Sequence, residues 1–186
     1  MLIAGICNSN AQTSDDIFTF KGIPIKGSVS EFSKKLQQQG FRIYDGEKIL
    51  SGKFMDQNVF VLLNQDQNEP SDITNVLVQF IGNGEGGNDI TLYLKIRSLL
   101  EKKYNDSNKW AIEDMMDMKE YPNIETVKAI RQGKYSYTYR IFNTNINRVS
   151  YITLTWINKG IFLVYFNPYT IEKIERRKDQ QSMSDL

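Results

Sequence analysis

The stretch VLVQFIGNGEGGNDITLYLKI (residues 76–96) joins an apolar strand to an amphipathic helix through a loop that contains four glycines. A helix followed by strands precedes this stretch, and a second helix followed by strands comes after it. The order of elements therefore begins again at the loop. Such grouping of helices and strands, without strict alternation, favours an α+β fold.

Upstream of the loop, the spacing predicts a strand over residues 17–25 and a helix that begins after Ser28. Glu31 stands three residues after Ser28, which is typical of a capping box, and Gly40 stands where a glycine ends a helix. Three strands are expected over residues 41–50, 53–64 and 73–81. The dipeptides DG (45–46) and SG (51–52) are read as the turns.

Downstream of the loop, residues 89–104 carry an apolar stripe at helical spacing, formed by Tyr93, Ile96, Leu100 and Tyr104. Residues 105–123 are polar and are expected to form a loop. Strands are predicted over 127–142, 149–158 and 160–167, with a hairpin at NKG (158–160) and a charged helix over 171–178.

The sequence therefore predicts two tandem αβββ-type units whose antiparallel sheets are covered by helices, with an N-terminal strand and a short C-terminal helix. The expected division is a leader (1–16), a first unit (17–82), a glycine-rich hinge (83–88), a second unit with its terminal helix (89–178) and a disordered tail (179–186).

The composition excludes several chemistries. The 186 residues include no histidine and a single cysteine, Cys7, so histidine-dependent hydrolysis, an internal disulfide and a thiolate metal cluster are all excluded. Lys and Arg number 23 against 22 Asp and Glu, so the chain as a whole has no bias toward nucleic acid. We expect no cofactor, no metal and no catalytic residue.

The glycine loop matches G-x-G-x-x-G at Gly82, Gly84 and Gly87, which suggests a nucleotide-binding enzyme as an alternative. A dinucleotide site also needs a second parallel strand that ends in an acidic residue. The segment after the helix lacks such a strand, and Glu85 would place a carboxylate beside the phosphates. A hinge is the preferred interpretation.

The N-terminus resembles the end of an export signal. Residues 2–7 are apolar, and Ser9 and Ala11 occupy the small-residue positions of a signal-peptidase site. Cleavage after Ala11 would give a periplasmic or secreted chain that begins at Gln12; the alternative is a cytoplasmic protein. No segment of the sequence is long and apolar enough to cross a bilayer.

Aromatic residues alternate along GKYSYTYRIF (133–142), with basic residues nearby. We expect an exposed aromatic sheet face that binds a protein or peptide partner, because aromatic side chains are enriched at interfaces. An alternative is stacking of single-stranded nucleic acid on the strand from Tyr135 to Tyr139. The candidate partner-binding residues are Tyr135, Tyr137, Tyr139, Trp156 and Tyr165.

FKGIPIKGSVSEFSKKLQQQGF (20–41) and the following LSGKF (50–54) resemble a family of uncharacterised, often exported proteins from gut bacteria. More distantly, repeated units of a helix plus an antiparallel sheet resemble β-lactamase-inhibitor-protein and outer-membrane-assembly lipoprotein folds. The distant folds are binding modules, so the resemblance implies a binding or scaffolding protein, and it carries over no catalytic residue. Because the chain has no histidine and no recognisable catalytic constellation, we expect that it is not an enzyme. The matching positions are Phe20, Gly22, Ile23, Pro24, Ile25, Gly27, Phe32, Leu36, Gly40, Phe41, Gly52 and Phe54.

Overall fold

The computed structural model describes residues 17–66, 71–81, 88–106, 109–114, 124–144 and 151–184. The predicted export signal, with Cys7 and Ala11, and the glycines of the loop at 82–87 lie outside these residues. The export and hinge interpretations therefore stay predictions. In the described part the chain is an α+β protein, as the sequence predicts.

The first unit begins with a short hairpin, β1 (Thr19–Phe20) and β2 (Ile23–Pro24), whose turn residues Lys21 and Gly22 both have positive φ. The helix α1 (Val29–Gln38) follows. Ser28 caps it, because its Oγ accepts a hydrogen bond from the Glu31 N–H at 3.3 Å, which confirms the predicted cap. Four strands complete the unit: β3 (Arg42–Asp45), β4 (Ile49–Phe54), β5 (Gln57–Gln65) and β6 (Ile73–Phe80).

The second unit begins with α2 (Asn88–Lys103), whose predicted stripe is buried from Tyr93 to Tyr104. The remaining elements are β7 (Trp110–Asp114), α3 (Ile124–Arg131), β8 (Tyr137–Asn143), β9 (Tyr151–Ile157), β10 (Gly160–Phe166) and α4 (Pro168–Ser184). The hairpin predicted at 158–160 joins β9 to β10.

All strands except the first hairpin form one antiparallel sheet in the order β3-β4-β5-β6-β10-β9-β8-β7. Each unit contributes four consecutive strands, and the two units meet where the last strand of one pairs with the last strand of the other. Val78 of β6 lies opposite Leu163 of β10 in this central pair. From either edge of the sheet to its centre, the four strands of a unit therefore follow one another in chain order.

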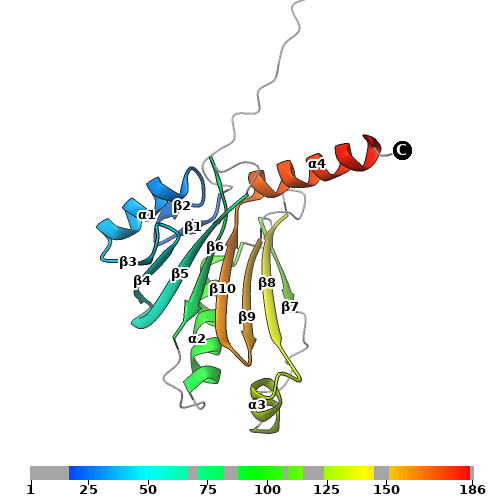
Figure 1. Ribbon diagram of the computed structural model, residues 1–186. Coiled ribbons are helices and arrows are strands. Elements are labelled where there is room, and N and C mark those ends of the chain that lie inside the picture. Colours follow the sequence, from blue (N-terminus) through cyan, green and yellow to red (C-terminus); the bar gives the residue numbers. More distant parts are fainter. Residues whose placement is uncertain are drawn as a thin grey trace, which may run out of the picture.

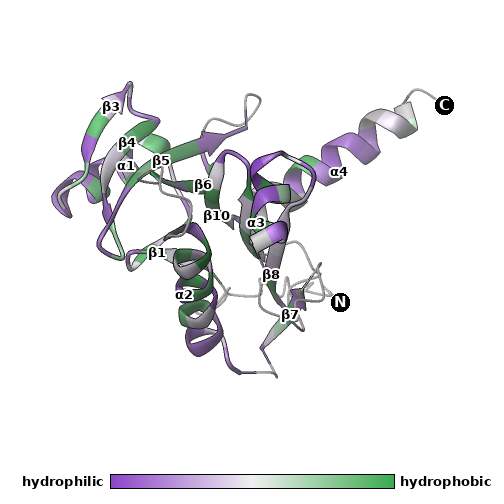
Figure 2. Cartoon of the chain, turned by 90° about the horizontal axis from the view of Figure 1, so that it is seen from below, coloured by the Kyte–Doolittle hydropathy of each residue, from purple (hydrophilic) through white to green (hydrophobic). Residues whose placement is uncertain are grey.

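The helix α2 lies behind the strands in Figure 1, and α1 and the hairpin β1–β2 pack on the same face, because their buried side chains belong to the same core. Side chains at alternate strand positions point into this side and form a single core with the helices. Figure 2, seen from below, shows α2 along one side of the sheet and hydrophobic residues on the central strands. We call this side the covered face and the opposite side the uncovered face.

Gly52 does not form the turn that the sequence predicts at residues 51–52. It lies within β4, and the chain turns instead at Met55 and Asp56, which both have positive φ. The reason for the glycine is packing, because a Cβ at this position would lie 2.4 Å from Cδ1 of the buried Phe41 ring. The absence of a side chain lets the ring rest directly on the strand.

Replacing Gly52 by alanine is expected to lower the free energy of unfolding by about 1–3 kcal/mol, the usual cost of overpacking a core. Urea denaturation of Gly52→Ala measures this loss. The double variant Gly52→Ala/Phe41→Leu removes the clashing ring, so the second substitution should cost much less in this background than alone. Additive losses would show that the ring and the strand are not coupled.

Two segments differ from the sequence-based prediction. Residues 124–131, which the prediction placed partly in a strand, form α3, because Val127 and Ile130 are three residues apart and are both buried on one side of a helix. The polar stretch expected to be a loop contains β7, which pairs with β8 at the edge of the sheet. The second unit therefore has four strands where three were predicted. The first unit also has four, because a turn at residues 46–48 divides the predicted strand 41–50 into β3 and the start of β4.

The C-terminal helix α4 is longer than predicted and extends through most of the expected disordered tail. Residues 171–184 contain no glycine or proline, so the helix has no internal stop. Its first turns are fixed to the body, because Thr170 Oγ1 donates to the Ile73 carbonyl at 3.2 Å and Arg177 pairs with Asp66. Its later turns project away from the sheet (Figure 1) and are largely hydrophilic (Figure 2).

Among the described residues, no helix has both the length and the apolar character needed to cross a membrane.

Candidate functional site

Four of the five predicted partner-binding residues lie in the core. Tyr139 is fully buried, and Tyr137, Trp156 and Tyr165 are between 2% and 7% exposed. They occupy the strand positions that face the helices, so the prediction of an exposed face built from them is wrong. Because bases cannot reach these rings, they cannot stack nucleic acid either. Only Tyr135 is exposed, at 56%, and it lies beside α3.

The buried aromatic residues hold α2 against the sheet. The Trp156 ring lies 6.0 Å from the rings of both Tyr93 and Tyr137, measured between centroids. The Arg97 guanidinium lies 4.9 Å from the centroid of the Tyr139 ring and also pairs with Glu101 at 3.0 Å. These contacts join a helix to two strands, which is a structural role.

Burial shifts the pKa of two tyrosines in the core and of one lysine beside it. Burial raises the pKa of the Tyr104 hydroxyl far above its ordinary value, and burial together with the nearby Tyr104 raises the pKa of Tyr165. Both hydroxyls therefore stay protonated. Burial lowers the pKa of Lys103, whose amino group lies 5.1 Å from the centroid of the Tyr104 ring. In the described part of the chain, no three acidic or cysteine side chains gather as a metal site would require.

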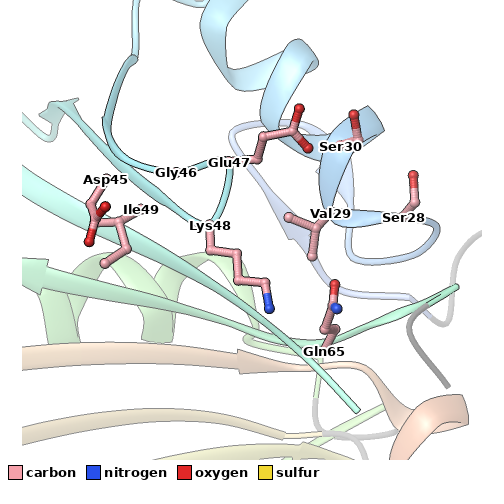
Figure 3. Close-up of a pocket in the computed structure, with 9 residues that line it drawn as sticks. All are labelled: Ser28, Val29, Ser30, Asp45, Gly46, Glu47, Lys48, Ile49 and Gln65. Carbon is pink, nitrogen blue, oxygen red and sulfur yellow. The ribbon is translucent and has the colours of Figure 1, made fainter. Parts of the chain in front are cut away.

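A pocket beside the start of α1 combines charges of both signs. Figure 3 shows Lys48 extending toward Gln65 while Glu47 turns toward Ser30, and Asp45 also lines the space. The carboxylates offset the lysine, so the site has no consistent preference for an anion or a cation. The Ser28 hydroxyl, which lies nearest the helix start, already accepts the hydrogen bond from the Glu31 N–H that caps α1.

The uncovered face is a surface on which neither α1 nor α2 packs. It consists of the alternate strand positions that point away from the helices, and Figure 1 shows no helix in front of them. Its centre is apolar, because Leu62, Leu77 and Val164 lie opposite one another across β5, β6 and β10. The half-buried apolar residues of this face are Phe60, Leu62, Leu77, Phe142, Tyr151, Phe162, Val164 and Phe166.

Toward β7, the uncovered face becomes more polar. Thr138 and Thr155 lie opposite each other on β8 and β9, with their hydroxyl oxygens 3.5 Å apart. Arg140 pairs with Glu113 at 3.3 Å and lies 5.0 Å from the centroid of the Tyr151 ring. An apolar centre beside a polar and partly charged margin is the usual composition of a protein interface.

The opposite end of the same face carries cations that form no ion pair with a described carboxylate. A shallow pocket of about 780 Å³ lies over β3, β4 and β5, and Lys21, Arg42 and Lys53 line it. Tyr44 and Phe60 form its apolar wall, with ring centroids 4.6 Å apart. No aspartate or glutamate is among the described residues that line the pocket.

Two apolar runs in the sequence indicate the uncovered face. VFVLL (59–63) and IFLVYF (161–166) are continuous apolar runs, which are typical of strands buried on both faces. Strands with one solvent-exposed face alternate apolar and polar residues instead. The runs therefore indicate a second apolar face, although they do not identify which face the helices cover.

Comparison of the chain with protein-family models, curated proteins and solved structures gave no match.

Proposed function

We propose that this chain is a non-enzymatic binding protein that holds another protein on the uncovered face of its sheet. The observation that carries the proposal is that β5 and β10 have apolar residues at consecutive positions, while α1 and α2 cover only one face of the sheet. A contiguous exposed apolar surface is a common mark of an interaction site.

The size of the face supports a protein partner. The sheet has eight strands, and their seven spacings of about 4.8 Å give a width of about 34 Å. Seven residues along a strand span about 24 Å, so the face offers about 800 Å², which is what each partner contributes to a stable interface of standard size. A small ligand would leave most of this surface exposed.

Site-specific photo-crosslinking tests the proposal. A photo-crosslinking phenylalanine analogue at Phe162, in the middle of the face, is expected to give a discrete protein adduct in cells. The same analogue at Tyr135, which is exposed but lies beside α3, serves as the control and should give none. An adduct of twice the chain's mass would indicate a second copy in place of a different protein. Failure to form any adduct at Phe162 would contradict the proposal.

Phe162→Thr is expected to weaken binding of the crosslinked partner, once purified, by about tenfold or more, as for a residue in the centre of an interface. Threonine keeps the strand propensity, and Thr155 already lies opposite this position. Isothermal titration calorimetry measures the affinity, with Tyr135→Thr as the matched variant. If Phe162→Thr and Tyr135→Thr bind the partner with equal affinity, Phe162 is not part of the interface.

A further inference from the structure

The pocket formed by Lys21, Arg42, Lys53, Tyr44 and Phe60 differs in charge from the rest of the molecule. The whole chain carries a formal net charge of only +1, so its cations and carboxylates are nearly balanced. The pocket instead has three cations and no described carboxylate. None of the ion pairs between described residues involves Lys21, Arg42 or Lys53. No carboxylate in the described part of the chain therefore neutralises them.

Anchored backbone holds these cations in place. Gln39 Nε2 donates to the Lys21 carbonyl at 3.1 Å, which ties the turn of the β1–β2 hairpin to the end of α1. The Lys21 amino group lies 5.6 Å from the centroid of the buried Phe41 ring. Arg42 follows Phe41 directly and pairs with Ser51 across β3 and β4. Only the side-chain ends need to be ordered when a ligand binds, which lowers the entropic cost.

The arrangement favours an anion whose charges are distributed. The three cations come from the β1–β2 turn, β3 and β4, and the pocket has a volume of about 780 Å³. A single phosphate is bound best by donors that converge on one point. Carboxylates spaced along a polypeptide match separate cations, and the Tyr44 and Phe60 rings offer an apolar surface for a neighbouring side chain.

We propose that this pocket binds an acidic segment of the protein partner, with its carboxylates on Lys21, Arg42 and Lys53 and an apolar side chain against Tyr44 and Phe60. The inference rests on the proposed function, because Phe60 belongs to both the pocket and the uncovered face. It identifies the partner as a protein with an acidic and apolar segment at the edge of its contact surface.

Fluorescence anisotropy with a labelled ten-residue peptide of alternating Glu and Tyr tests the inference. The full chain is expected to bind this peptide at least tenfold more tightly than a peptide of alternating Gln and Tyr. The affinity should fall when the salt concentration is raised from 50 to 300 mM, because the charges are exposed. Equal affinities for the two peptides, or no binding of the Glu–Tyr peptide at 1 mM, would overturn the inference.

Charge reversal locates the site. Arg42→Glu/Lys53→Glu should remove the tenfold preference for the Glu–Tyr peptide. Lys34→Glu/Lys95→Glu changes the net charge equally at exposed positions of α1 and α2, and it should leave the affinity within twofold. The same loss in both variants would mean that only the net charge matters. Displacement of the peptide by 1 mM inorganic phosphate would indicate a phosphate site and would also overturn the inference.

The two proposals fail separately. If a crosslinked adduct forms at Phe162 but neither peptide binds, the inference of an acidic segment is wrong, and the proposal that the uncovered face binds a protein still holds. If the Glu–Tyr peptide binds at the pocket but no adduct forms at Phe162, the cationic site is real and the protein interface is not.

Discussion

Tyr139→Ala is expected to lower the free energy of unfolding by about 3–5 kcal/mol, the range for truncating a large buried aromatic side chain. The Tyr139 ring is fully buried in β8, and the Arg97 guanidinium of α2 lies over it at 4.9 Å. Truncation would leave a cavity beneath α2 and remove the surface on which Arg97 rests. Urea denaturation followed by far-UV circular dichroism measures the change.

Tyr135→Ala provides a matched control, because the same side chain is removed four residues earlier in the chain. Tyr135 is 56% exposed, so its loss should change the free energy of unfolding by no more than about 0.5 kcal/mol. The contrast between the two variants separates a core position from a surface position in the segment 135–139, where the sequence suggested a binding face. Similar small losses in both would mean that the Tyr139 ring is not in the core.

Phe20→Ala is expected to cost about 3–5 kcal/mol as well, for a different reason. Phe20 belongs to the short β1–β2 hairpin, yet its ring contacts both halves of the molecule. Its centroid lies 5.0 Å from that of Phe54 on β4 and 5.6 Å from that of Tyr165 on β10. Removing the ring would loosen the hairpin and weaken the contact between the two units.

Phe20→Leu is the matched variant that keeps most of the buried volume and so keeps the hairpin packed against the core. Leucine retains much of the buried volume, so its cost should stay below about 1.5 kcal/mol. Differential scanning calorimetry of both variants measures the stability and the number of transitions, with one cooperative transition expected for the wild type. A loss for Phe20→Ala below 1 kcal/mol would show that the hairpin contributes little to the core.

The sequence predicted those elements that are marked by local chemistry. Ser28, Glu31 and Gly40 defined the limits of α1, and the stripe from Tyr93 to Tyr104 identified α2, because caps and helical spacing act within a few residues. The α+β class followed from the order of these elements. Each of these signals can be read without knowing how the chain packs.

The remaining features depend on contacts between distant residues. Gly52 has the local character of a turn, but its role is set by the Phe41 ring, which approaches from another element. The alternation along β8 separated its residues into two faces without identifying the face that the helices cover, so Tyr137 and Tyr139 were placed on the wrong side. The strand β7 lies in a mostly polar stretch of the sequence, and only its pairing with β8 identifies it as part of the sheet.

The central pairing of β6 with β10 has a consequence for biosynthesis. Val78 must pair with Leu163, so the middle of the sheet cannot close until translation has passed β10. Until then β6 is an unpaired, apolar edge strand of the nascent first half, and such strands promote association with other chains. Contacts of such large sequence separation also slow folding, so the β6 edge stays open to association with other chains until the second half pairs with it.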